Sequence, residues 1–314
     1  MGVGAQSKIT PLELWWDLAQ TNLNIYLVRG ELTGLIDTAA PSCGLREVLA
    51  NSQVPLNAIG LILNTHGHSD HTGGNALVKG ESNARIFIHQ DDAVFLEDHG
   101  KCFDEFFGPM SAALRGEEAA RKERDAFIEA NGPDLPVDRI LNDNDVVDFG
   151  KGLALRVIHI PGHTSGSVGF LLEEEGILIT GDATPGLGNP GGALPIILDV
   201  VSYQKSIGRL LELPIKTLYT THPFRGLHSP PATVHTGNDV RPFLMDCREL
   251  AGKLAEALYQ QAGSGLDRTL AQMVDSVVES LPAEMGFKKT ADLFMPEFSL
   301  ATVFWSLRNL AASQ

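Results

Sequence analysis

Cysteine is scarce in this chain of 314 residues, and its three copies, Cys43, Cys102 and Cys247, lie far apart. An odd number of distant cysteines argues against a disulfide framework and fits a reducing compartment. We expect each thiol to be a small buried apolar group rather than a metal ligand. No run of ~18 uninterrupted apolar residues occurs, and residues 1–10 lack a basic region followed by an apolar one. The sequence therefore predicts a cytoplasmic protein without a membrane partner.

Positive charge is also in short supply, because 24 lysine and arginine residues face 39 aspartate and glutamate residues, a formal net charge of −15. Such a surface repels phosphate backbones and no basic stripe offsets it, which excludes nucleic acid as a partner. The hydrophobic share of 43% is enough for a sizeable core. The length fits two domains, or one large α/β domain with an appendage.

Strands and helices are expected to alternate in the first two thirds of the chain. Short apolar runs bounded by turn residues predict strands, and periodic segments between them predict helices. The expected strands are 24–29, 33–38, 59–64, 85–89, 145–149, 153–160, 168–172, 177–180 and 216–220, and the expected helices are 45–50, 70–78 and 202–213. This alternation is typical of an α/β layer structure.

Two further helical segments are expected outside this alternation. Phenylalanines at helical spacing between residues 99 and 142 predict a helical insertion, which is either a lid-like pocket wall or plain packing. After His235 only helical apolar stripes remain. We therefore expect residues 1–235 to form the main domain and residues 236–314 an α-helical C-terminal extension, which could also mediate a homodimer.

The stretch Thr65–His71 carries four metal-ligand side chains directly after a buried strand. His66 and His68 are two apart in extended chain, so their imidazoles leave on the same side. Asp70 and His71 open a helix from another direction, and ligands that point two ways suit two metals better than one. A carboxylate packed among imidazoles at the end of a core strand needs a cation to compensate its desolvation.

Three more residues of ligand type, His163, Asp182 and His222, stand where expected strands end. Strand ends at one edge of a sheet form a shared rim, where residues distant in sequence converge. Imidazole nitrogen and carboxylate oxygen without thiolate suit Zn²⁺, with iron, manganese or cobalt as tolerable substitutes.

With these residues in this order, the chain resembles the metallo-β-lactamase superfamily, in its glyoxalase II-like and thioesterase-like hydrolase branch, over roughly residues 20–235. The resemblance implies an αββα sandwich, with residues 1–235 as its catalytic domain and a dinuclear site at one edge. It also implies the ligand sets, which are His66, His68 and His163 for the first metal, Asp70, His71 and His222 for the second, and Asp182 as the bridge, with Asp37 supporting them from behind.

Two local features depart from the family pattern. Thr221 precedes His222 where relatives often carry glycine, and Pro223 follows it. The residues after Asp182 lack the tyrosine that is typical of acyl-homoserine lactonases, which counts against the lactonase interpretation.

Several residues are candidates for a pocket around the metals. Arg225 and His228 lie close behind the last ligand and are our candidates for substrate binding, since an arginine can hold a carboxylate through a bidentate contact. The Gly- and Pro-rich stretch 186–195 is expected to border the pocket flexibly, and Trp15 and Trp16 either flap over it or pack at an edge. The remaining histidines, His89, His99, His159 and His235, are expected to be surface or hydrogen-bonded residues.

The leading hypothesis is a dinuclear metallohydrolase that cleaves an ester or thioester of a small-molecule substrate with a metal-bridging hydroxide. Two divalent ions, Zn²⁺ first and iron or manganese as alternatives, would lower the pKa of water from ~15.7 toward 7. Asp70 is the expected catalytic residue, because it can orient the hydroxide. A lactonase of the same fold, a mononuclear iron persulfide dioxygenase that uses only the first-site ligands, and a partner-binding module stay open as alternatives.

Overall fold

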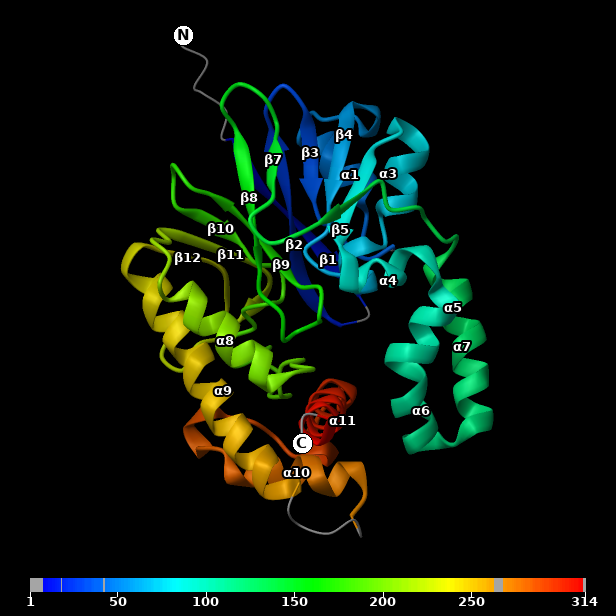
Figure 1. Ribbon diagram of the computed structural model, residues 1–314, viewed down its shortest axis with the longest axis vertical. Helices are drawn as coiled ribbons and strands as arrows, with labels where there is room; N and C mark the ends of the chain where they lie inside the picture. Colours follow the sequence, from blue (N-terminus) through cyan, green and yellow to red (C-terminus); the bar gives the residue numbers. More distant parts are fainter. Residues whose placement is uncertain (1–7, 18, 42, 263–267, 313–314) are drawn as a thin grey trace.

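Two six-stranded sheets lie face to face, with helices on the outer face of each (Figure 1). The computed structural model describes residues 8–17, 19–41, 43–262 and 268–312. The first sheet has the order β1-β2-β3-β4-β5-β6 and the second the order β12-β11-β10-β9-β8-β7. This arrangement confirms the predicted αββα sandwich. The outermost residues of the two predicted domains, 1–7 and 313–314, lie outside the described residues.

The elements alternate much as the sequence predicts. The strands are β1 Ile9–Trp16, β2 Thr21–Arg29, β3 Thr33–Ile36, β4 Ile59–Leu63, β5 Arg85–His89, β6 Arg139–Leu141, β7 Val146–Asp148, β8 Ala154–His159, β9 Val168–Leu172, β10 Ile177–Ile179, β11 Thr217–Phe224 and β12 Ala232–Thr236. The α-helices are α1 Leu45–Asn51, α2 Ser69–Thr72, α3 Asn75–Ser82, α4 Val94–Glu97, α5 His99–Cys102, α6 Gly108–Arg115, α7 Glu117–Asn131, α8 Val200–Leu210, α9 Val240–Ala262, α10 Leu270–Ser280 and α11 Glu297–Ala312. Short 3-10 turns and one π-helical turn, η3 Phe103–Phe107, complete the described elements. None of the helices within the described ranges is long and apolar enough to cross a membrane.

Apolar side chains fill the three spaces between the four layers. The space between the sheets contains Leu63 of the first sheet and Phe170 of the second. Outside the first sheet, Leu49 of α1 and Val78 of α3 are buried. Outside the second sheet, α8, α9, α10 and α11 contribute to one apolar cluster. The C-terminal extension therefore shares its core with the sandwich instead of forming a separate one.

The sequence does not predict the edge strand β1, which pairs antiparallel with residues 21–28 of β2. Pro11 interrupts its pattern, since proline cannot donate to a strand ladder, but an edge strand tolerates it. β12 is also unpredicted, and it pairs antiparallel with β11. β1 thus forms one edge of the first sheet, and β12 forms one edge of the second.

The prediction of a single helix over residues 70–78 is wrong, because Gly73 and Gly74 separate α2 from α3. A Cβ at Gly73 would lie 2.3 Å from the Cδ of Pro41, and one at Gly74 would lie 2.4 Å from the carbonyl oxygen of Thr38. Only glycine allows this close approach. The break lets α2 sit against the segment that follows β3, at the end of the sheet.

The predicted insertion is helical from α5 to α7 and then returns to the first sheet as β6. β6 pairs parallel with β5, so the insertion leaves and rejoins the sheet at neighbouring strands. In Figure 1 these helices extend beyond the sandwich, and α11 lies between them and α9.

Candidate metal centre

The sequence-predicted ligands come from both sheets and meet at one end of the sandwich. His66 and His68 follow β4, and His163 follows β8. Asp182 follows β10, and His222 lies in the irregular part of β11, where the pairing with β12 shifts register. Asp70 and His71 belong to α2. The structure thus brings together all seven residues from four separate segments of the chain.

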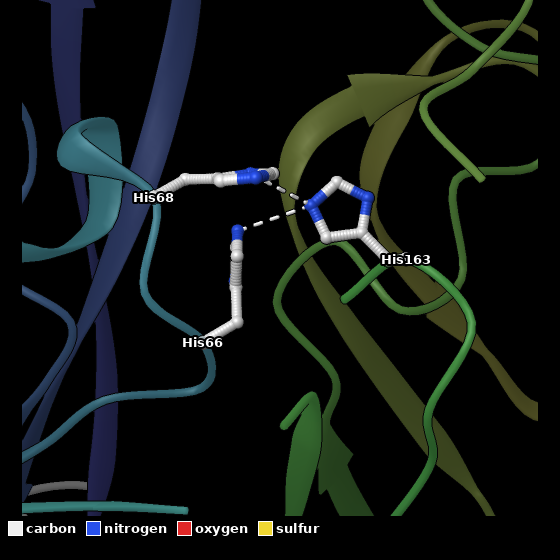
Figure 2. Close-up of side chains that lie close together, drawn as sticks. All are labelled: His66, His68 and His163. Carbon is white, nitrogen blue, oxygen red and sulfur yellow. Dashed lines mark hydrogen bonds between the residues drawn. The ribbon is translucent and has the colours of Figure 1, made fainter. Parts of the chain in front are cut away.

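Three imidazoles form the first group, and Figure 2 shows their ring nitrogens pointing toward one another. The Nε2 atom of His163 lies 3.1 Å from Nε2 of His66 and 3.1 Å from Nδ1 of His68. Nitrogens that each lie 2.0–2.1 Å from one tetrahedral zinc ion are ~3.4 Å apart. The Nδ1 atom of His163 donates to the carbonyl oxygen of Ile196 at 2.8 Å, which leaves the Nε2 lone pair facing the other two rings.

Two carboxylates and two imidazoles form the second group, Asp70, His71, Asp182 and His222, whose ligand atoms all lie within 4.8 Å of one another. The Nε2 atom of His222 is 3.0 Å from Oδ2 of Asp70. The Nε2 atom of His71 and the Oδ1 atom of Asp182 are buried, 3.6 Å apart, and lack a hydrogen-bond partner among the described residues. Buried polar atoms without partners are costly, and a cation between them would satisfy both. The residues present therefore fit a bound metal ion.

Asp37 lies behind the second group and fixes its geometry. Its Oδ2 atom is 2.8 Å from Nδ1 of His71, and its Oδ1 accepts a hydrogen bond from the backbone N–H of Thr65 at 2.8 Å. Because Nδ1 of His71 donates to this carboxylate, Nε2 is the ring nitrogen that faces the second group, where it would exchange its proton for a bound cation. Asp37 has a φ of 60°, a left-handed conformation that aspartate tolerates better than most residues.

We expect Asp37→Asn to lower metal affinity at the second group by about 10- to 100-fold. The amide NH₂ that replaces Oδ2 would donate to Nδ1 of His71, which forces the ring proton onto Nε2 and removes a ligand lone pair. The hydrogen bond from Thr65 to the remaining oxygen persists, so the fold should hold. Competitive zinc titration measures the effect, and the affinity at the three-imidazole group is the internal control. Equal losses at both groups would contradict this role.

The two groups differ in electrostatic character. Burial lowers the pKa of His66 and of His68, that of His68 to about 3, and neighbouring imidazoles add to the effect. These rings are therefore neutral at physiological pH, which is the form that binds a metal ion. Burial also disfavours a charged His71, but three nearby carboxylates, Asp70 foremost, raise its pKa well above the usual range. The second group thus concentrates negative charge, which favours a cation there.

Asp92, just after β5, is a site residue that the sequence analysis misses. It is fully buried, and its Oδ2 accepts hydrogen bonds from the N–H of Gly67 at 2.8 Å and the hydroxyl of Thr164 at 2.7 Å. Its Oδ1 accepts from the N–H of Gly166 at 2.8 Å. Burial raises the pKa of Asp92 to about 6, although these three donors oppose the shift. This carboxylate therefore ties the loop between the first two ligands to the loop that carries His163.

A cavity of about 220 Å³ opens at the two groups. Trp16 lines it and stacks on His222 with ring centroids 6.0 Å apart, whereas Trp15 is exposed. Much of the stretch 186–195 borders the cavity, as predicted. Neither of our substrate-binding candidates is among the described lining residues, since Arg225 packs over the ring of Phe287 and His228 is exposed.

The other histidines lie away from this centre. His89, Asp91 and His159 also bring three ligand atoms within 4.8 Å. However, the rings of His89 and His159 stack 4.2 Å apart at an interplanar angle of 10°, so their in-plane lone pairs run parallel instead of converging. The Nδ1 atom of His99 lies 2.9 Å from Asp134. The expectation of a surface or hydrogen-bonded residue is wrong for His235, because its ring is buried against Phe243 and its Nε2 atom lacks a hydrogen-bond partner among the described residues.

This chain is similar to one family model and to several known proteins. A family model described as the Metallo-beta-lactamase superfamily matches residues 20–222. The probable metallo-hydrolase YqgX of Bacillus subtilis is 29% identical over 188 residues, which cover 58% of this chain and 74% of that protein. A hydroxyacylglutathione hydrolase of Anaeromyxobacter dehalogenans is 32% identical over 161 residues, 51% of this chain and 45% of that protein.

Two further matches extend the comparison. The human acyl-coenzyme A thioesterase MBLAC2 is 31% identical over 173 residues, 51% of this chain and 57% of that protein. The chain thus spans about half the length of this thioesterase and of the hydroxyacylglutathione hydrolase. The crystal structure of the metallo-beta-lactamase family protein TTHA1429 from Thermus thermophilus matches with a TM-score of 0.68 and 24% identity, over 98% of this chain and 94% of that one. This last match shows a shared fold.

Proposed function

This chain belongs to the metallo-beta-lactamase superfamily, and we propose from that membership and the geometry of its centre that it hydrolyses thioesters with two divalent metal ions. The family and the histidine and aspartate groups together support a metal-dependent hydrolase. The convergence of seven side chains into two neighbouring ligand groups is the observation that carries the finer proposal of two ions.

Each ligand group would hold one ion. The proposed ligands are His66, His68 and His163 for the first ion, Asp70, His71 and His222 for the second, and Asp182 between them. Nitrogen and oxygen donors without thiolate suit Zn²⁺, and iron or manganese are tolerable substitutes. Divalent ions held there would supply a water molecule of lowered pKa and would polarise a carbonyl oxygen.

Asp70 is proposed to orient the attacking water. It lines the cavity, and burial alone would raise its pKa, but His71 and His222 hold that pKa well below the usual range. Its carboxylate therefore stays ionised and accepts a hydrogen bond from the water. The water adds to the thioester carbonyl, the C–S bond breaks, and a carboxylic acid and a thiol leave.

The thioester bond is favoured by the relatives. One is named as a hydroxyacylglutathione hydrolase and another as an acyl-coenzyme A thioesterase, and both match at modest identity. A mononuclear dioxygenase needs only one ion, so the second group of four ligand residues counts against that alternative.

We expect zinc-loaded protein to contain about two ions per chain and to hydrolyse N-acetylcysteamine thioesters, because both groups would be filled. Elemental analysis and chromogenic detection of the released thiol measure this. Chelation should abolish hydrolysis, and added zinc should restore it. Undiminished hydrolysis by metal-free protein would contradict the proposal. One iron per chain with oxygen consumption on a persulfide would favour the dioxygenase, and cleavage of lactones alone would favour the lactonase.

A further inference from the structure

A second cavity, which we call the side chamber, adjoins the cavity at the metal centre. It measures about 500 Å³. Six lining residues are common to the two cavities, namely His68, Phe95, Phe107, Phe127, Ile196 and Phe298. The two cavities therefore adjoin one another at these six residues, with His68 on the shared wall.

The walls of the side chamber are apolar and come from segments far apart in the sequence. The ring of Phe95 lies 5.8 Å from that of His68 and 4.7 Å from that of Phe106, between centroids. The remaining apolar lining comes from the insertion, from the segment before α8 and from α11, namely Phe103, Phe107, Met110, Leu114, Ala126, Phe127, Ile196, Leu198, Phe298, Ala301 and Trp305. A largely aromatic and aliphatic wall next to a few reactive polar groups is typical of a small-molecule site.

The charged residues that line the side chamber are paired with one another. Nη1 of Arg115 lies 2.7 Å from Oε1 of Glu123, and Nη2 lies 3.7 Å from Oε1 of Glu297. Among the described lining residues, no unpaired lysine or arginine remains for a phosphate or a carboxylate. The side chamber therefore suits an uncharged apolar group better than a charged leaving group.

One wall of the side chamber is tied to a metal ligand. Oγ1 of Thr302 and Oγ of Ser306, both buried on α11, donate to carbonyls of the loop 194–198 at 2.7 and 3.0 Å. In the same loop, the carbonyl of Ile196 accepts the hydrogen bond from Nδ1 of His163. Hydrogen bonds thus connect α11, in the wall of the side chamber, to the loop 194–198 and through this loop to His163 at the metal centre.

The opposite wall contains the π-helical turn η3, Phe103–Phe107. Turns of this kind are rare, and they frequently occur at functional sites. Phe103, Phe106 and Phe107 all line the side chamber. The irregular turn thus supplies three of its aromatic side chains within five residues.

We infer that the side chamber binds the acyl chain of the thioester, so that the enzyme selects extended apolar acyl groups. This inference rests on the proposed function. With the chain in the chamber, the thioester carbonyl lies at the metal centre and the thiol side faces the loop 185–196. After water adds and the C–S bond breaks, the thiol departs with a proton and the carboxylic acid keeps its tail in the chamber.

The test uses the zinc-loaded full chain and N-acetylcysteamine thioesters of acetate, butyrate, hexanoate, octanoate and decanoate, which share one leaving thiol. We expect kcat/KM to rise roughly two- to fourfold with each added methylene until the chamber is full, because complete burial of one methylene corresponds to about fourfold. The affinity for the free carboxylates, measured by calorimetry, should rise in parallel, and it requires no turnover.

A bulky side chain that fills the side chamber should remove the preference for longer acyl chains. We expect Ala301→Phe to lower the octanoate-to-butyrate ratio, in both kcat/KM and affinity, by about tenfold or more. Ala311→Phe, at the exposed end of the same helix, is the matched control and should keep both ratios. If Ala301→Phe does not fold, Met110→Gln serves, since an amide in the opposite wall weakens apolar binding.

The outcomes separate this inference from the proposed function. Thioester cleavage or carboxylate binding without dependence on chain length would overturn the inference, as would equal ratios in the wild type and a folded Ala301→Phe variant. Failure to cleave any thioester would overturn the proposed function, whereas a rise in carboxylate affinity with chain length would still support the chamber as the site of an apolar chain.

Discussion

Asp182→Ala is expected to lower kcat/KM for thioesters by roughly 10³-fold or more while the protein stays folded. The two carboxylate oxygens of Asp182 each lie 3.6 Å from Nε2 of an imidazole, Oδ1 from His71 and Oδ2 from His222. The variant removes one of the two carboxylates of the second ligand group, so binding of the second ion and the position of the water should both suffer. A loss of ~4 kcal/mol of transition-state stabilisation corresponds to this factor.

The control for Asp182→Ala is Asp148→Ala, which removes the same charge from an exposed position at the end of β7. Metal content, thiol release and circular dichroism are measured on both variants. The control should keep wild-type values in all three. A folded Asp182→Ala protein with two ions and undiminished turnover would refute the assignment of this residue.

The convergence of the candidate ligands could be predicted because the signals are local. His66, His68, Asp70 and His71 fall within six residues, and each later candidate follows a short apolar run that predicts a strand. Strand ends on neighbouring segments gather at one rim, so the sequence alone anticipates the convergence that the structure shows. The alternation of strands and helices predicts an α/β layer structure, and the resemblance to the superfamily adds the αββα sandwich.

Other parts of the site depend on tertiary contacts that carry no local signal. Asp92 looks like an ordinary turn residue, and only the folded chain brings Gly67, Thr164 and Gly166 to its two oxygens. The side chamber likewise needs helices that are separated by nearly 200 residues to face one another. Proximity in sequence suggested Arg225 for the pocket, yet its guanidinium turns toward the C-terminal extension instead.

We expect Asp92→Ala to lower the free energy of unfolding by about 3 kcal/mol and the metal affinity of the three-imidazole group by about 10- to 100-fold. The variant leaves the N–H groups of Gly67 and Gly166 and the hydroxyl of Thr164 buried without an acceptor. Each unsatisfied donor costs ~1–3 kcal/mol, and the variant recovers the desolvation cost that raises the pKa of Asp92 to about 6. Without this tie the loops that carry His66 and His163 separate more easily.

The losses of stability and of metal affinity in Asp92→Ala must be measured separately, because metal binding itself stabilises the folded state. Urea unfolding in excess chelator gives the part due to lost hydrogen bonds, and competitive zinc titration gives the part due to ligand placement. Asp91→Ala is the matched control, since this neighbouring carboxylate is exposed. Asp92→Asn should fall between the two variants, because its single amide oxygen cannot accept all three hydrogen bonds and its NH₂ group faces a donor. If Asp92→Ala unfolds like the control without metal but binds zinc as tightly as the wild type, Asp92 has neither role.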